Sequence, residues 1–185
     1  FEAGSMDVFD AVSGTVGAGF GVSADQARSG TKAFYYANGG NKDINRGFML
    51  LPGSPTEIYM RIACRFTGTF VYSGTRGVFM QIQGATGQHL TFCIHKDTYA
   101  LNIYRKASEA LLAASAPLML NTWYCFEIHM VIHATFGVIQ VKQDGSTIID
   151  LTGTEETPLN TAGGTGGISA VSLGGGIGTS SGYYQ

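Results

Sequence analysis

The chain of 185 residues carries 11 basic and 13 acidic side chains, for a net charge of −2, and only 13% of its residues are charged. This balance provides neither a basic surface for nucleic acid nor a cationic patch for a membrane, so we expect neither partner. No run of about 18 apolar residues occurs, which argues against a transmembrane helix. With 44% hydrophobic residues and 27 glycines, the composition is typical of one all-β domain, residues 1–185, with many turns.

Apolar residues recur at every second position along much of the chain, which is the period of a half-buried strand. The expected strands of the first part are Asp7–Val12, Thr31–Tyr36, Gly47–Leu51, Glu57–Phe66, Val78–Gln83, Leu90–His95 and Ala100–Tyr104. In the fifth of these, the alternation turns Val78 inward and Phe79 outward. Ala107–Ala116 has a helix-forming composition, but between strands we interpret it as a short strand near Ala110–Ala113. A short helix is the alternative, although it would be marginal without packing.

Three strands in the last third form the most strongly predicted unit of the chain. They are Trp123–His133, Val138–Gln143 and Ser146–Leu151, and a later strand, Ile168–Leu173, follows. Asp144-Gly145 predicts a two-residue type I′ turn, because such a turn needs positive φ at both central positions. A regular ladder after this turn sets Val141 opposite Ile148.

The same register gives the hairpin apolar side chains on both of its faces. Three of them project opposite to the core-facing set: Val138, Ile149 and Leu151. An exposed apolar face usually marks a subunit interface, so these three residues are the interface candidates.

Short motifs are scattered over almost the whole chain. It opens with Phe1-Glu2-Ala3-Gly4, its hairpin unit contains Trp123-Tyr124 and Asp144-Gly145, and a glycine-rich segment lies at 166–175. In this order the motifs resemble the concanavalin A-like (LamG-like, lectin/glucanase) jelly-roll domains found in phage and other viral structural proteins. The resemblance implies a two-sheet antiparallel jelly-roll sandwich with little or no helix. It also implies a closing strand that begins near Tyr183, where this sequence ends, so we expect that strand to be missing or supplied from elsewhere.

The catalytic strand motif of the glucanases with this fold, Glu-x-Asp-x-x-Glu, does not occur in the sequence. That motif places two carboxylates on one strand face about 5–5.5 Å apart, as retaining hydrolysis requires. Glu127 is followed by Ile128 and His129, with no second acid until Asp144. The alginate-lyase-type pattern, a Tyr/Lys strand motif with a paired Arg-Glu strand, is likewise absent. We therefore expect no enzymatic activity.

Glu127, His129 and His133 share one face of a predicted strand, which raises the question of a metal site. Alternate side chains along a strand lie about 6.6 Å apart, so these residues would need ligands from a neighbouring strand to hold an ion. A polar solvent face is the simpler interpretation. We predict no metal site and no cofactor, with a calcium ion bound in a loop left open as an alternative.

The three cysteines, Cys64, Cys93 and Cys125, are too few and too scattered for a disulfide framework. We expect free thiols, with a Cys93–Cys125 bond as the alternative if their strands are neighbours.

The middle strands present a polar and aromatic outer set. Its members are Tyr59, Arg61, Arg65, Phe79, Gln81, Gln83, His95, Asn102 and Tyr104. Aromatic rings that stack on sugars, together with amide and guanidinium groups that bind hydroxyls, are what a glycan site needs. The glycan-contact candidates are Tyr59, Arg61, Gln81, His95, Asn102 and Tyr104, and an ordinary exposed sheet face is the alternative.

The resemblance and the low charge together lead to a first hypothesis on function. We expect a non-enzymatic structural module of a virion, either a capsid decoration or a fibre or tail component of a phage. Such a module would be located in the virion, contact other virion proteins and form a homo-oligomer. A lectin-like attachment module that binds a surface polysaccharide is the alternative, and a polysaccharide hydrolase or lyase is a third hypothesis.

Overall fold

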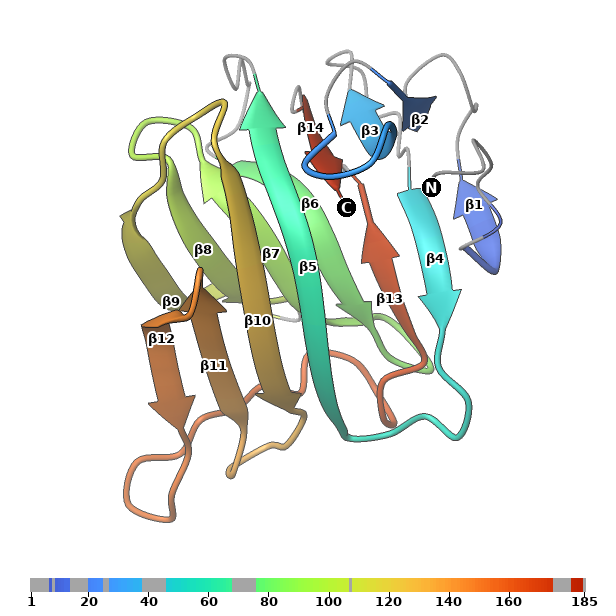
Figure 1. The fold of residues 1–185 in the computed structure, drawn as a ribbon. Coiled ribbons are helices and arrows are strands. Elements are labelled where there is room, and N and C mark those ends of the chain that lie inside the picture. The colour runs from blue at the N-terminus through green and yellow to red at the C-terminus, as the bar shows by residue number, and fades with distance from the viewer. Residues whose placement is uncertain are drawn as a thin grey trace.

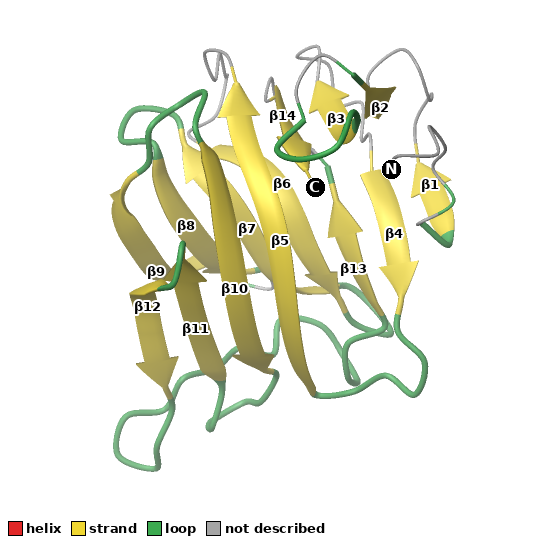
Figure 2. Ribbon diagram, viewed as in Figure 1, coloured by secondary structure: helices red, strands yellow, loops and turns green. Residues whose placement is uncertain are grey.

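The computed structural model describes residues 7, 9–13, 20–24, 27–37, 46–67, 76–106, 108–174 and 181–184. Every regular element in these ranges is a β-strand, and Figure 2 shows strands and loops without a helix. The all-β fold predicted from the sequence is therefore confirmed. The same ranges contain no helix long and apolar enough to cross a membrane.

The strands form two seven-stranded antiparallel sheets that stack as a jelly-roll sandwich. Sheet A contains, in spatial order, β1 (Ala11–Ser13), β4 (Arg46–Leu50), β13 (Ala170–Leu173), β6 (Arg76–Gln83), β7 (Gln88–His95), β8 (Ala100–Arg105) and β9 (Ala110–Pro117). Sheet B contains β12 (Ser146–Thr152), β11 (Val138–Gln143), β10 (Trp123–Val131), β5 (Glu57–Thr67), β14 (Ser181–Tyr184), β3 (Ala33–Ala37) and β2 (Phe20–Ser23). Figure 1 looks onto sheet B, with sheet A behind it.

The strand β9 was predicted from the sequence, whereas β2 and β14 were not. The helix-like composition of Ala107–Ala116 forms a strand, β9, which pairs with β8 at the edge of sheet A. The interpretation as a strand is therefore confirmed, because tertiary pairing overrides a weak local propensity. Alternation did not predict β2 or β14, and β14 lies between β5 and β3 in sheet B.

The core lies between the two sheets and is built from alternate residues of the long strands. Phe66 of β5 packs edge-on against Phe79 of β6, with ring centroids 5.0 Å apart. The largest fully buried side chains are Phe34, Phe66, Phe79, Phe92, Phe126, Met80, Ile82, Leu90 and Ile94. Burying each such side chain contributes about 1.5–3 kcal/mol to folding.

The inward position of Phe79 corrects the sequence prediction that it faces outward. The register between β6 and β7 shifts between Val78 and Met80: Val78 pairs with Cys93, whereas Met80 pairs with Phe92. A β-bulge adds one residue to a strand and so reverses the alternation before it. Phe79 consequently joins the core, and Val78 takes the outer side of sheet A.

The hairpin of β11 and β12 has the predicted turn, since Asp144 and Gly145 have φ values of 50° and 86°. Asp144 Oδ1 also accepts a hydrogen bond of 2.9 Å from the backbone N–H of Cys125 in β10. The ladder shifts between Val141 and Lys142, however, so Val141 pairs with Ile149 instead of the expected Ile148.

This bulge changes the faces of two interface candidates. Ile149 pairs with Val141, and Leu151 pairs with Ile139, which places both on the inner face of sheet B. Their predicted outward projection is therefore wrong, because the alternation from the turn did not include the extra residue. Val138 lies on the same outer side as Gln140 and is half-buried. Its role as an interface residue stays a prediction.

All three cysteines are free and buried. The alternative of a Cys93–Cys125 bond does not apply, because Cys93 lies in β7 of sheet A and Cys125 in β10 of sheet B. Burial raises the pKa of the Cys93 thiol to about 12. Burial, and then the neighbouring charge of Cys125, raise the pKa of Cys64 as well.

The loop after β12 returns to the sandwich through a close backbone contact at Gly153. The N–H of Gly153 donates a 2.8 Å hydrogen bond to the carbonyl of Gly137. A Cβ on Gly153 would overlap the Thr135 carbonyl oxygen and lie 2.7 Å from the Leu159 nitrogen. Only glycine fits this position without a shift of the backbone.

Candidate functional site

The six glycan-contact candidates divide between the two outer faces of the sandwich. Tyr59 and Arg61 lie in β5 on sheet B, whereas Gln81, His95, Asn102 and Tyr104 lie in strands β6, β7 and β8 of sheet A. One continuous site containing all six is therefore not formed.

The outer face of sheet A carries a row of polar side chains that crosses four neighbouring strands. Ser172, Gln81, Thr91 and Tyr104 are in register from β13 to β8. Asn102 lies two residues from Tyr104 along β8, and its Nδ2 donates a 3.2 Å hydrogen bond to the Tyr104 hydroxyl. The structure thus brings together three of the predicted residues, Gln81, Asn102 and Tyr104.

A cation covers part of this row. The guanidinium carbon of Arg76 lies 4.0 Å from the centre of the Tyr104 ring, and its Nη1 is 2.8 Å from Glu109 Oε2. Burial favours the neutral form of Glu109, but hydrogen bonds and charges from Lys106 and Arg76 outweigh it and lower the pKa of that carboxyl. Arg76 and Glu109 together form a cap, named here the Arg76 cap, over the Tyr104 ring at the end of the polar row.

Among the described residues, three buried side-chain oxygens of sheet A have no hydrogen-bond partner: Gln88 Oε1 in β7 and, within the polar row, Thr91 Oγ1 and Asn102 Oδ1. Thr91 and Asn102 are 4% and 5% exposed. A buried polar atom without a partner costs about 1–3 kcal/mol, so native proteins retain few of them. Arg46, at the start of β4, also has an unpartnered buried atom, its Nε, and burial lowers the pKa of this guanidinium.

His95, the fourth candidate on sheet A, is committed to the local turn. Its Nδ1 accepts hydrogen bonds from the backbone N–H groups of Asp97 and Thr98, at 3.3 and 3.4 Å. This ring nitrogen fixes the turn between β7 and β8. The sequence pattern could not show it, because the alternation gives the side of the sheet and not the hydrogen-bond partner.

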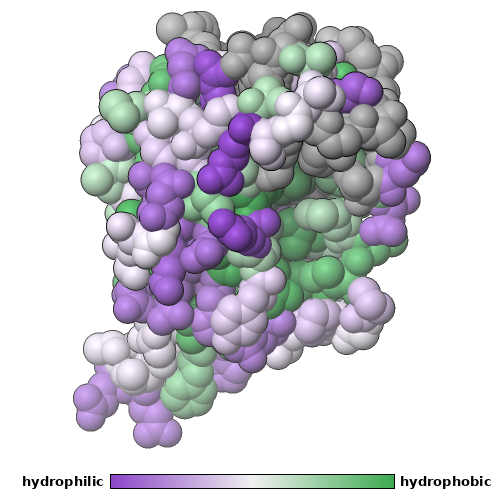
Figure 3. All heavy atoms as spheres, in the orientation of Figure 1, coloured by the Kyte–Doolittle hydropathy of each residue, from purple (hydrophilic) through white to green (hydrophobic). Residues whose placement is uncertain are grey.

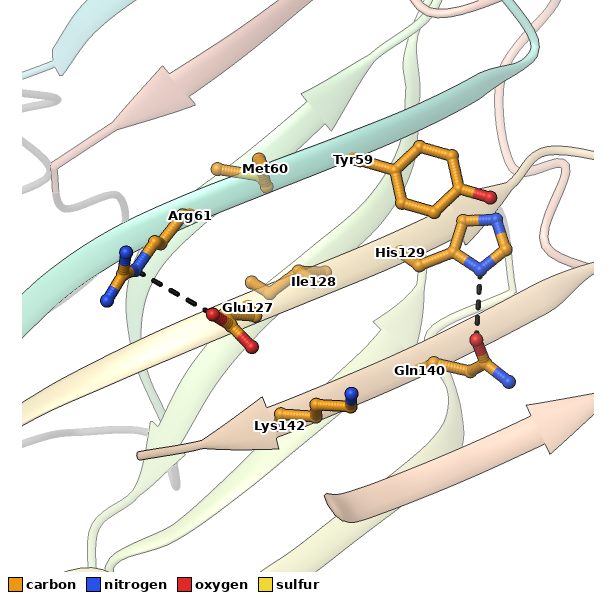
Figure 4. Close-up of a pocket in the computed structure, with 8 residues that line it drawn as sticks. All are labelled: Tyr59, Met60, Arg61, Glu127, Ile128, His129, Gln140 and Lys142. Atoms are coloured by element: carbon orange, nitrogen blue, oxygen red, sulfur yellow. Dashed lines mark hydrogen bonds and ion pairs between the residues drawn. The ribbon is translucent and has the colours of Figure 1, made fainter. Parts of the chain in front are cut away.

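The outer face of sheet B contains a groove with a volume of about 430 Å³. It is lined by Tyr59, Met60, Arg61, Glu127, Ile128, His129, Gln140 and Lys142 (Figure 4). These residues come from β5, β10 and β11, and their pairing places Arg61, Glu127 and Lys142 on one rung. In Figure 3, which views this face, hydrophilic residues gather over β10–β12.

A chain of hydrogen bonds organises one end of the groove. Glu57 Oε1 lies 2.8 Å from His129 Nε2 and accepts a 3.0 Å hydrogen bond from the Tyr59 hydroxyl. The bonds from His129 and then Tyr59 lower the pKa of Glu57, and its carboxylate in turn raises the pKa of Tyr59. On its other side, His129 Nδ1 lies 3.0 Å from Gln140 Oε1, and Gln140 Nε2 donates to Asp150 Oδ1 at 2.9 Å.

The residues considered for a metal site on this strand do not converge. His129 contacts Glu57 and Gln140, while His133 Nδ1 accepts hydrogen bonds from the N–H groups of Thr135 and Phe136. The described residues contain no group of three or more His, Cys, Asp or Glu side chains placed to hold an ion.

The sequence did not single out Thr91, Arg76 and Glu109. Thr91 lies at an outward position of a predicted strand and was a detectable member of the polar row. Arg76 and Glu109 lie outside the strands expected from alternation, so their approach to Tyr104 depends on the folded sheet. No local signal in the sequence indicates that contact.

Searches of sequence-family models and of curated proteins give no match. Solved structures do match. Cellulose induced protein, Cip1, is 17% identical with a TM-score of 0.67, and the match covers 90% of this chain and 82% of that one. An alginate lyase from Corynebacterium sp. is 14% identical, with a TM-score of 0.57 and coverages of 92% and 79%. Carbohydrate-binding module CBM66 from Bacillus subtilis is 9% identical, with a TM-score of 0.50 and coverages of 93% and 96%.

These similarities support the concanavalin A-like jelly-roll fold expected from the sequence motifs. At such low identities they show the fold alone, because one fold supports binding modules and enzymes alike.

Proposed function

We propose that this chain is a non-enzymatic carbohydrate-binding module and that the sugar lies on the outer face of sheet A. The observation that carries the proposal is the pair of buried, unpartnered oxygens, Thr91 Oγ1 and Asn102 Oδ1, within the polar row. A sugar hydroxyl both donates and accepts hydrogen bonds, so it can donate to an amide oxygen and bond a threonine hydroxyl in either direction. Gln81 and Ser172 extend the same row.

The Arg76 guanidinium covers one face of the Tyr104 ring, so a sugar that reaches this face of the ring has to displace Arg76. The Arg76 and Glu109 side chains are 29% and 43% exposed, so the ion pair between them is partly solvated. Exposed ion pairs contribute only about 0–1 kcal/mol, so breaking the ion pair between Arg76 and Glu109 requires little free energy. The guanidinium can then bond the sugar from above while the strand side chains bond it from below.

Two of the solved structures with this fold support a carbohydrate ligand by their names, an alginate lyase and a carbohydrate-binding module. The absence of the glucanase strand motif from the sequence favours binding over hydrolysis. The strongest support remains the polar row itself.

The first test is a glycan-array screen of the purified domain, with calcium and with a chelator. A competable signal is expected, and its titration is then repeated with Thr91→Val. The matched control is Thr147→Val, an exposed position in β12 on sheet B. Loss of binding in Thr91→Val but not in Thr147→Val supports the proposal, and a blank array or equal binding by both variants contradicts it. Sensitivity to the chelator would indicate the calcium ion that the sequence leaves open.

The structural role in a virion, as a capsid decoration or a fibre or tail component, stays a prediction from the sequence resemblance. A module of that kind would use the same sugar-binding face for attachment. Light scattering of the purified domain tests the associated expectation of a homo-oligomer.

A further inference from the structure

The groove on the outer face of sheet B lies on the opposite side of the sandwich from the proposed sugar-binding row. Its volume of about 430 Å³ falls within the range of about 300–1,000 Å³ that is usual for small-molecule sites. It has two parts, an aromatic end at Tyr59 and a charged end at Arg61 and Lys142, which Figure 4 shows together.

The aromatic end is a ring held in a fixed orientation. The Tyr59 ring stacks on the His129 ring with centroids 4.1 Å apart and planes only 3° from parallel. Glu57 bonds both residues, and Gln140 bonds His129 from the other side. Tyr59 is nevertheless 73% exposed, so much of its ring surface stays open to a ligand. A preorganised aromatic surface binds another ring at a low entropic cost.

The charged end has an excess of positive charge. Glu127 lies between Arg61 and Lys142 on one rung, so two cations flank one carboxylate. Arg61 Nε is 3.8 Å from Glu127 Oε1 and donates a hydrogen bond to Cys125 Sγ. Among the described residues, no carboxylate lies within ion-pair distance of the Lys142 ammonium. One positive charge therefore remains for a ligand.

We propose that this groove binds a small ring compound that carries a carboxylate. The ring lies against Tyr59, and the carboxylate binds the Lys142 ammonium through a charge-assisted hydrogen bond. Arg61 adds a second positive charge to this end of the groove, although its guanidinium already faces Glu127. The site is independent of the sugar-binding row, since no residue is shared between them.

The test uses four probes in two matched pairs: glucuronate with glucose, and benzoate with benzyl alcohol. Each is titrated into the ¹⁵N-labelled domain, and amide shifts are followed by NMR. Both carboxylates, or one of them, are expected to shift the amides of β5, β10 and β11, whereas the neutral partner of that pair does not. The pair that responds identifies the ring as a sugar or as an aromatic group.

The variant Lys142→Gln is expected to weaken the binding of the carboxylate about three- to five-fold, because the lost contact is an exposed charge pair. Tyr59→Ala is expected to abolish the shifts, and Thr91→Val on sheet A should leave them unchanged. The proposal is overturned if no probe shifts these strands, if the neutral probes bind equally well, or if Lys142→Gln binds as wild type does. Because Thr91→Val affects only the other face, failure here and failure of the sugar-binding proposal are distinguishable.

Discussion

Replacing Thr91 by valine tests two effects of its buried hydroxyl group, a lower stability of the fold and a higher affinity for sugar. The substitution exchanges a hydroxyl for a methyl group of similar volume and keeps a β-branched side chain in a central strand. Thr91 is 4% exposed, and its Oγ1 has no partner among the described residues. We therefore expect the variant to be more stable than the wild type and to lose sugar affinity.

The magnitude follows from the hydroxyl alone. A buried polar group without a partner costs about 1–3 kcal/mol, so removing it should raise the free energy of unfolding by about 1–2 kcal/mol. For a domain of 150–250 residues, each kcal/mol shifts the melting temperature by about 2–4 °C. The expected increase is therefore about 2–8 °C.

Urea unfolding followed by circular dichroism measures this change, with Thr147→Val on the solvent-exposed part of β12 as the control. The control should change the free energy of unfolding by less than about 0.5 kcal/mol. A destabilised Thr91→Val would refute the reasoning, because it would mean that the hydroxyl already makes a favourable bond. A more stable variant that keeps full sugar affinity would refute the functional part.

Three further outcomes are expected. Glu109→Gln should raise sugar affinity about two- to five-fold in calorimetry, because it releases Arg76 from an exposed ion pair. Unchanged or weaker binding would show that Arg76 does not have to move for the sugar to bind. The advantage of wild type over Glu57→Gln in urea unfolding should be present at neutral pH and be lost as the pH falls through the lowered pKa of Glu57, because the contact with His129 favours the charged carboxylate. An advantage that stays constant from neutral pH to the most acidic buffer in which the domain remains folded would exclude this cause. Gly153→Ala should destabilise the fold by more than about 2 kcal/mol in the same assay, since its Cβ would overlap a backbone carbonyl; a near-neutral result would mean that the loop can shift.

The sequence predicted the strands well because the signal for a strand is local. The alternation in Glu57–Phe66 and the Asp144-Gly145 turn both appear in the structure as β5 and the β11–β12 hairpin. The errors in side-chain direction came from single extra residues. The bulge between Val78 and Met80 moved Phe79 into the core, and the bulge opposite Val141 and Lys142 moved Ile149 and Leu151 inward. One inserted residue reverses a period of two, and no turn signal marks it.

The candidate site was less predictable because it depends on which sheet each strand joins. Tyr59 and Tyr104 both lie at outward positions, yet β5 belongs to sheet B and β8 to sheet A. Alternation assigns a face within one strand but does not assign the strand to a sheet. The cap of Arg76 over Tyr104 likewise requires residues that are distant along the chain.

The three buried cysteines lie in both sheets, so their reaction with a thiol reagent can report local opening of each sheet. Cys93 lies in β7 of sheet A, while Cys64 and Cys125 lie in neighbouring strands of sheet B. Only a thiolate reacts with an alkylating reagent, and burial holds the pKa of Cys93 at about 12. Each thiol must therefore become exposed before it is modified, and its labelling rate in the native state measures how often that strand separates from the sandwich. Mass spectrometry of the separate peptides would then give the opening free energy of each sheet without any engineered probe.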